Sequence, residues 1–214
     1  MTSEIAYIAT VLVIILVSMT FHEAMHGFMA YWLGDTTAKD EGRLTLNPLK
    51  HIDPFMTVIL PLVLAITGMP VFGGAKPVPF NPYRVKGGEW GAALVGLAGP
   101  LTNLLLATIF YAIWTVAGAP LRGVEGMVLT TGVLVNLGFF VFNMLPIPPL
   151  DGSRILYALA PDSARRVMEI IEQYGIFVVL GMVLLFGTQV GQLMNALITA
   201  IVGLLSTIFG TQML

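Results

Sequence analysis

The chain has 214 residues, of which 57% are hydrophobic and 10% are charged, and its mean hydropathy is +0.88. Soluble domains usually carry about 25% charged residues, so this deficit of charge indicates a protein that lies in lipid. The lack of cysteine excludes disulfides, thiolate metal sites and thiol nucleophiles, and a net charge of −2 without a basic tract argues against a nucleic-acid partner.

Long uncharged stretches recur along the chain, and a helix that crosses a bilayer needs about 20 apolar residues. The first stretch begins at Ile5, carries no charge through Phe21 and continues with apolar residues through Leu33. It is too long for a cleaved signal peptide and lacks the basic region that precedes one. Further stretches are Trp90–Leu121, Gly126–Leu150 and Gln173–Leu214, the last of which is long enough for two passes. We therefore expect an all-α polytopic membrane protein with about five to six membrane segments.

Another uncharged stretch, Pro54–Ala75, is interrupted by Pro61, Gly68 and Pro70. If it crossed the bilayer, the ten lysines and arginines would divide six to four between the two sides. If it returned to the side it came from, they would divide nine to one, with Arg122 alone on the opposite side. Positive residues gather on the cytoplasmic side of membrane proteins. We therefore predict a re-entrant or interfacial segment near 54–75, with the N-terminus outside.

Polar residues interrupt the first apolar stretch in the motif His22-Glu23-Ala24-Met25-His26. Positions i and i+4 share one face of a helix, so His22 and His26 can bind one metal ion. Glu23 can reach a water molecule on that metal, which is the H-E-x-x-H arrangement of zinc hydrolases. The motif also occurs by chance, but ionisable residues inside a membrane segment are costly and indicate function. On the predicted topology the site lies about 26 Å along the helix, toward the cytoplasmic face.

A catalytic zinc site needs a third protein ligand. His51 and Asp53 are available in a polar loop flanked by prolines, but this loop is better interpreted as a solvated turn. Asp151 is a stronger candidate because the prolines of "NMLPIPPLDGSR", residues 143–154, end an apolar helix, and irregular backbone at membrane depth lines a cavity or is buried. Asp151 can then complete a set of two histidines and one aspartate. For Asp151 alone, a helix N-cap is the competing interpretation.

Asn143 opens the same stretch, eight residues before Asp151. Its side-chain amide is suited to hold a substrate carbonyl or the oxyanion that develops from it.

Together these stretches resemble the site-2 protease family of intramembrane zinc metalloproteases, which pairs H-E-x-x-H in one membrane helix with N-x-x-P-x-P-x-L-D-G in a later one. The second motif is matched here at Asn143, Pro146, Pro148, Leu150, Asp151 and Gly152. A third family element, G-P-x-x-N, is matched at Gly99, Pro100 and Asn103. The resemblance covers Ile5 to about Tyr157 and is closest to the short form of the family, without a PDZ or CBS domain.

The resemblance implies zinc ligands His22, His26 and Asp151, one zinc per chain, and Glu23 as general base. It also implies a supporting role for Asn143 near the scissile carbonyl. Five further residues of these motifs are expected either to bind substrate or to have a structural role: Asn103, Gly99, Pro100, Pro146 and Pro148. Residues 1–157 would form the metalloprotease core, and residues 158–214 a connecting segment and C-terminal membrane helices of the same domain.

Two segments, Gly42–Pro48 and Gly74–Tyr83, have the alternation and proline content of short extended structure. We expect short β elements there, near the active site, where a strand edge could hold a substrate backbone. For both segments, ordinary loops are an alternative that the sequence supports equally well.

We therefore interpret the chain as a zinc-dependent intramembrane endopeptidase that cleaves transmembrane protein substrates. We expect the protein to lie in the lipid bilayer of a prokaryotic plasma membrane, with its active site toward the cytoplasm. A polytopic metal transporter or metal-sensing membrane protein with the same ligands is the alternative. The sequence leaves the substrate and the oligomeric state open.

Overall fold

The computed structural model describes residues 2–69 and 73–211, and every regular element in these ranges is a helix. The long elements are α1 (Thr2–Trp32), α4 (Gly88–Val116), α5 (Gly123–Asn143) and α8 (Gly175–Phe209). The short elements are α2 (Thr37–Asp40), a 3₁₀ turn (Pro48–Lys50), a π-helical turn (Pro54–Ile59) that continues into α3 (Leu60–Ile66), α6 (Ser153–Leu159) and α7 (Asp162–Gln173).

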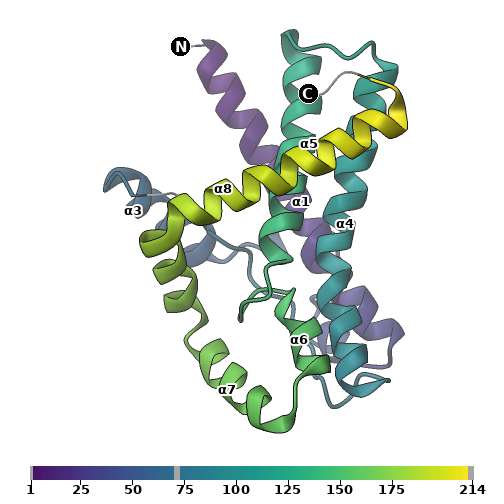
Figure 1. Ribbon diagram of the computed structural model, residues 1–214, viewed down its shortest axis with the longest axis vertical. Coiled ribbons are helices and arrows are strands. Elements are labelled where there is room, and N and C mark those ends of the chain that lie inside the picture. Colours follow the sequence, from purple (N-terminus) through teal and green to yellow (C-terminus); the bar gives the residue numbers. More distant parts are fainter. Residues whose placement is uncertain (1, 70–72, 212–214) are drawn as a thin grey trace.

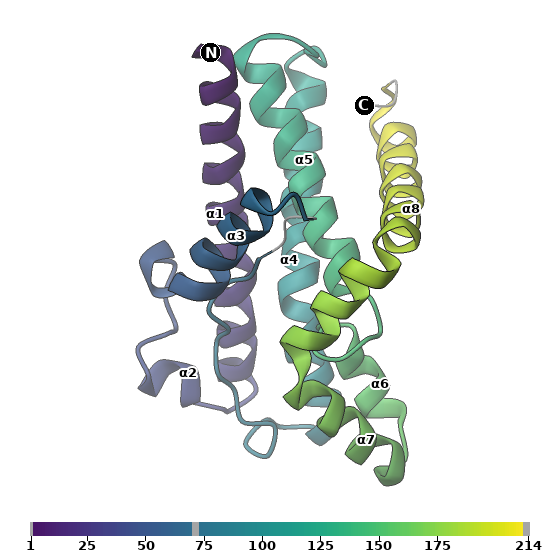
Figure 2. The ribbon, with the colours of Figure 1, turned by 90° about the vertical axis from the view of Figure 1, so that its left-hand side faces the viewer.

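Helices α1, α4 and α5 form a bundle in which α4 packs against both of the others (Figures 1 and 2). Small residues on α4 allow this close approach, because helices in lipid associate through backbone proximity and packing rather than through water exclusion. Gly91, Ala92, Gly96 and Gly99 of α4 are all buried. A separate buried cluster joins α4 and α5 to the second half of α8, and it consists of Ala107, Tyr111, Trp114, Val133, Leu137, Val202 and Leu205.

Four helices in the described residues are long and apolar enough to cross a membrane, which makes this an integral membrane protein. These candidate spans are Ile5–Trp32, Gly88–Val116, Gly123–Asn143 and Gly175–Phe209. The expected count of five to six is not confirmed. The stretch after Gln173, which is long enough for two passes, forms one helix that bends at Phe186, where the backbone is non-helical at φ −123°. Length alone suggested two passes; the structure has two helical parts that meet at this kink, and α8 as a whole is one candidate span.

The segment predicted near 54–75 returns to the end of the bundle from which it starts. The amide of Gly74 donates to the Met56 carbonyl (3.1 Å), and the amide of Lys76 donates to the His51 carbonyl (2.8 Å). The chain after the short helix therefore lies beside the chain before it, as a re-entrant or interfacial segment would. The apolar helix itself, Pro54–Ile66, is too short to span a bilayer. Residues 70–72 of the predicted segment lie outside the described part.

The short β elements expected at 42–48 and 74–83 are not confirmed, since the described residues contain no strand. The amides of the second segment have partners other than a neighbouring strand. Val78 N donates to the Glu23 carboxylate (2.9 Å), and Asn81 N donates to the Asp35 carboxylate (2.6 Å). Prolines at 77, 79 and 82 have no amide hydrogen to contribute to a ladder.

The connections between helices gather at two ends of the bundle. Helices α2, α6 and α7 lie toward the end opposite the N-terminus, whereas α3 lies level with the middle of α1 (Figure 2). The turn between α4 and α5 lies at the N-terminal end. Of the ten lysines and arginines, only Arg122 belongs to this turn, and the other nine belong to the α1–α4 and α5–α8 connections.

Candidate metal centre

Two histidines of α1 direct their Nε2 atoms to one point, and these two atoms lie 3.1 Å apart. Their other ring nitrogens contact acceptor oxygens: His22 Nδ1 is 2.6 Å from Asn103 Oδ1, and His26 Nδ1 is 2.7 Å from the Val95 carbonyl. Because a carbonyl oxygen can only accept, each Nδ1 must carry the proton. In the neutral imidazoles both Nε2 atoms therefore present lone pairs to the space between them.

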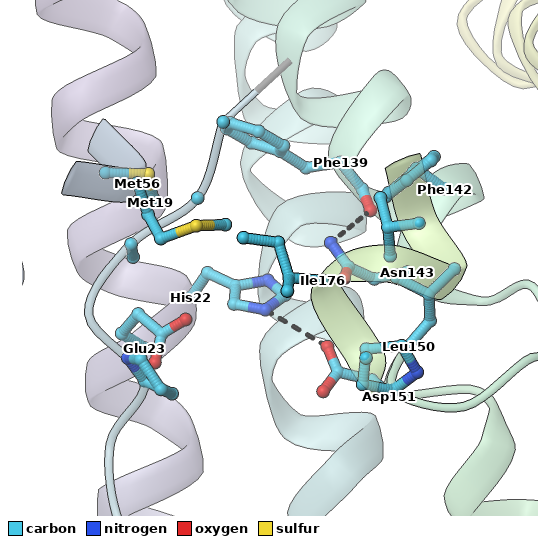
Figure 3. A pocket seen from close by; sticks show the side chains of 17 residues that line it. Met19, His22, Glu23, Met56, Phe139, Phe142, Asn143, Leu150, Asp151 and Ile176 are labelled. Carbon is cyan, nitrogen blue, oxygen red and sulfur yellow. Dashed lines mark hydrogen bonds and ion pairs between the residues drawn. The ribbon is translucent and has the colours of Figure 1, made fainter. Parts of the chain in front are cut away.

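Asp151 brings a third electron-pair donor to the same point from the turn that follows α5. Its Oδ2 lies 3.1 Å from His22 Nε2 (Figure 3) and 3.4 Å from His26 Nε2. This oxygen is buried and has no hydrogen-bond partner in the described residues. The turn is held by the amide of Gly152, which donates to the Asn143 carbonyl at 2.7 Å.

The spacing of the three atoms fits a tetrahedral metal ion. Zinc–nitrogen bonds of about 2.0–2.1 Å give ligand atoms separated by about 3.3 Å along a tetrahedron edge. The observed separations are 3.1, 3.1 and 3.4 Å. Three lone pairs converging in a buried site repel one another unless a cation lies among them. The set leaves one tetrahedral position open, as in catalytic rather than structural zinc sites.

A chain of buried amides supports His22. Asn103 is fully buried, and its Nδ2 donates to Asn136 Oδ1 (2.9 Å), while Asn136 Nδ2 donates to the Gly132 carbonyl (2.8 Å). Asn103 thus holds the imidazole from behind and does not line the cavity. Asn136 was not predicted from the sequence. Its signal was an asparagine inside the apolar stretch 126–150, where an unpaired polar side chain is costly.

Gly99 of α4 lies against the Nε2 edges of the two imidazoles, and Pro100 follows it in the helix. A Cβ built on Gly99 would approach His26 Nε2 to 2.3 Å and His22 Nε2 to 2.7 Å, so only glycine fits there. Pro100 is buried within the helix and has no amide hydrogen to donate. Neither residue lines the cavity. Gly99 therefore leaves room for the two imidazoles to converge, and Pro100 contributes to the packing of α4.

A cavity of about 320 Å³ opens beside the three donor atoms (Figure 3). It lies between α1, residues 73–77, the end of α5 and the beginning of α8. Its apolar lining consists largely of Met19, Met56, Phe139, Phe142, Pro149, Leu150, Ile176 and Val179. The polar groups that reach it are His22, Glu23, Asn143 and Asp151. The cavity thus combines a mostly apolar wall with a few converging polar groups, as binding sites do.

Glu23 lies on the α1 side of this cavity, opposite Asp151, in the view of Figure 3. Its Oε2 accepts the Val78 amide, which fixes the side chain beside His22. Asn143 lines the same cavity, and its Nδ2 donates to the Phe139 carbonyl at 3.0 Å. An amide nitrogen carries two hydrogens, so one remains for a ligand.

Pro146 and Pro148, the two prolines named in the sequence motif, belong to the turn before Asp151 and not to the wall of the cavity. Pro146 is exposed and Pro148 is buried, and neither lines the cavity. Both lie in the connection that delivers Asp151 to the histidines.

His51 and Asp53 do not join the centre, since only His22, His26 and Asp151 form a metal-binding group among the described residues. The solvated-turn interpretation of His51 is wrong: its side chain is fully buried, and its Nε2 lies 2.8 Å from the Thr45 carbonyl. Asp53 caps the helix that begins at Pro54, accepting the amides of Phe55 (2.9 Å) and Met56 (2.7 Å).

A bundle of apolar helices that carries an H-E-x-x-H helix and a converging aspartate defines a membrane protein of the zinc-metallopeptidase class. The comparisons with known proteins agree. Residues 121–186, which include Asp151, match the model of "Peptidase family M50". The chain is 40% identical over 209 residues to YwhC of Bacillus subtilis, named "Putative zinc metalloprotease", covering 91% of this chain and 90% of that protein.

A second relative, Rip2 of Mycolicibacterium smegmatis, has the same designation and is 30% identical over 179 residues, covering 82% of this chain and 68% of that protein. No solved structure matches. The chain belongs to peptidase family M50, the site-2 protease family, and is a metalloendopeptidase. The resemblance stated from the sequence motifs is thereby confirmed.

Proposed function

We propose that the protein is a zinc-dependent endopeptidase that hydrolyses peptide bonds within or near the transmembrane segments of other membrane proteins. The observation that carries the proposal is the convergence of His22 Nε2, His26 Nε2 and Asp151 Oδ2 on one buried point, with Glu23 beside it. Elements of three candidate membrane helices enclose the adjoining cavity, and most of its wall is apolar. An apolar segment of a membrane protein fits such a wall.

His22, His26 and Asp151 would hold one zinc ion per chain, which supplies a Lewis acid that makes water a nucleophile near neutral pH. Asn103 and the Val95 carbonyl keep the Nδ1 protons in place, so that both Nε2 lone pairs stay directed at the metal position.

Glu23 is the proton carrier of the proposed reaction. Its carboxylate takes a proton from the attacking water as the water oxygen bonds to the peptide carbonyl carbon. It then delivers that proton to the amide nitrogen as the carbon–nitrogen bond breaks. The remaining amide hydrogen of Asn143 donates to the carbonyl oxygen as negative charge develops on it. The immediate products are a carboxylic acid and an amine, and Glu23 is regenerated; transfer of the second water proton then gives a carboxylate and an ammonium group.

The distribution of charge supports an orientation in which the N-terminus is outside the cell. Nine of the ten lysines and arginines belong to the α1–α4 and α5–α8 connections, whose helices α2, α6 and α7 lie toward the end of the bundle opposite the N-terminus (Figure 2). Positive connections favour the cytoplasm, so this end would face it. The cavity lies on the cytoplasmic half of α1 in that orientation. Bacterial relatives support a prokaryotic plasma membrane as the location.

The test is Glu23→Gln, with exposed Glu41→Gln as the matched control. Both variants and the wild type, loaded with zinc and reconstituted in liposomes, are mixed with a library of transmembrane peptides, and cleavage is followed by mass spectrometry. We expect Glu23→Gln to lose about 10²- to 10⁴-fold in rate while retaining zinc, because a general base contributes a factor of that size. The control should cleave at the wild-type rate.

Two results would contradict the proposal. One is cleavage of no peptide by the zinc-loaded wild type. The other is an unchanged rate in Glu23→Gln. Zinc that exchanges across the liposome membrane independently of Glu23 would favour the transporter alternative.

A further inference from the structure

Helix α7 presents an apolar face that no part of the described protein covers. Val167, Ile170 and Tyr174 are 56%, 56% and 59% exposed, and α7 has no buried residue. The spacing i, i+3, i+7 puts these three side chains on one side of the helix. The other side carries Arg165, Glu169 and Glu172, so the helix is strongly amphipathic.

The polar side of α7 is attached to α6, which fixes the direction of the apolar side. The Glu172 carboxylate pairs with the Arg154 guanidinium and accepts the Tyr157 hydroxyl at 2.8 Å. Arg165 Nε donates to the Tyr157 carbonyl, also at 2.8 Å. Because Arg165 and Glu172 are seven residues apart, they hold one face of the helix against the protein. The opposite face is therefore turned outward.

The outward face of α7 continues into the exposed apolar surface of α8, a candidate membrane span. Helix α7 ends at Gln173, and α8, a candidate membrane span, begins at Gly175 (Figure 1). Phe177, three residues after Tyr174 and 69% exposed, extends the apolar surface onto α8. Figures 1 and 2 place α7 at the end of the bundle, where a spanning helix leaves the hydrocarbon. Tyrosine is enriched at that boundary.

We propose that α7 lies in the interface of the lipid bilayer, with Val167, Ile170 and Tyr174 inserted among the acyl chains and Glu169 in water. Amphipathic helices bind membrane surfaces in this way. The inference goes beyond the proposed peptidase activity, because it requires neither zinc nor substrate. Its structural consequence is that α6, one residue after the Asp151–Gly152 turn, is held through Glu172 by a helix resting on the membrane.

The chain has no cysteine, so single cysteines can be introduced and spin-labelled without removing native ones. The test compares Val167→Cys with Glu169→Cys, two exposed positions on opposite sides of α7. Each labelled protein is reconstituted in liposomes of phosphatidylcholine and phosphatidylglycerol after gel filtration and circular dichroism establish that it is folded. Electron paramagnetic resonance then measures collisions of the label with oxygen, which concentrates in lipid, and with a nickel chelate, which stays in water.

We expect the logarithm of the oxygen-to-nickel collision ratio to be positive at 167 and negative at 169. Nickel access at both positions would place α7 in water and overturn the proposal. Protection of position 167 from both reagents would mean that protein, such as a second copy of this chain, covers the face, and this result would also overturn it.

Discussion

Asn103 of α4 accepts the Nδ1 proton of His22 of α1 across 2.6 Å, although the two residues are 81 positions apart in sequence. This contact determines which nitrogen of His22 faces the cavity with a free lone pair. Asn103 is held in turn by Asn136 of α5, so all three helices of the bundle contribute to the orientation of one imidazole. The metal centre therefore depends on the packing of the bundle as well as on the H-E-x-x-H motif.

Replacing Asn103 with leucine should weaken zinc binding about 10- to 100-fold, the usual cost of removing the partner that orients a metal-binding histidine. The matched control is Thr102→Val on the same helix, because the Thr102 hydroxyl donates to the Ala98 carbonyl within α4. Competition with a fluorescent chelator measures both affinities. Equal zinc affinity in Asn103→Leu and the wild type would show that Asn103 does not orient His22.

Gly99→Ala should abolish zinc binding. The new methyl group would lie 2.3 Å from His26 Nε2, well inside contact distance, and so the imidazoles must move apart. Gly138→Ala in α5 is the control, because a Cβ built there meets no other part of the described protein within 4 Å beyond its own stretch of helix. Elemental analysis of the purified variants gives zinc per chain. Full zinc occupancy in Gly99→Ala would contradict the close approach of α4 to the histidines.

Asp35 ties the end of α1 to the segment that passes Glu23. Its carboxylate accepts the amides of Thr37 (3.0 Å) and Asn81 (2.6 Å). Burial raises the pKa of Asp35, but these hydrogen bonds to Thr37 and Asn81 outweigh burial and hold the pKa below its ordinary value of 3.8. Since the folded protein binds this proton more weakly than the unfolded chain, the ionised carboxylate stabilises the fold above that pH.

Asp35→Asn should therefore lower the free energy of unfolding at pH 7 by about 1.5–3 kcal/mol, the range for hydrogen bonds to a charged group. The difference from the wild type should persist down to about pH 4 and shrink as the pH falls further, because the wild-type carboxylate then gains its proton. Chemical unfolding in detergent across this pH range measures it, with exposed Asp40→Asn as the control. A difference that does not change with pH would exclude the charge as its source.

The residues of the centre could be predicted from the sequence because their spacing carries the information. His22 and His26 share a helix face, and the prolines before Asp151 indicate irregular backbone in an apolar region. The roles of Asn103 and Gly99 required the structure, because both depend on how α4 lies against α1. Asn136 was missed because it belongs to no motif, although a polar side chain in an apolar helix was a usable signal.

The parts of the fold that sequence patterns mispredicted are those decided by tertiary partners. The extended segment 74–83 has the alternation of a strand, but Glu23 and Asp35 take the amides of Val78 and Asn81. The last 42 residues, Gln173–Leu214, contain no charge and no proline, so their length was the sole guide to the number of passes. No charged residue or proline in the sequence marks the bend at Phe186.

The most direct test of a single centre built from two distant motifs is the zinc content of Asp151→Ala beside that of the wild type. Asp162→Ala on α7 serves as the control, because the side chain of Asp162 is 85% exposed and belongs to no metal-binding group among the described residues. We expect about one zinc per chain in the wild type and the control, and nearly complete loss of zinc in Asp151→Ala. Full zinc occupancy without Asp151 would contradict the assignment of the three ligands and with it the proposed catalytic centre.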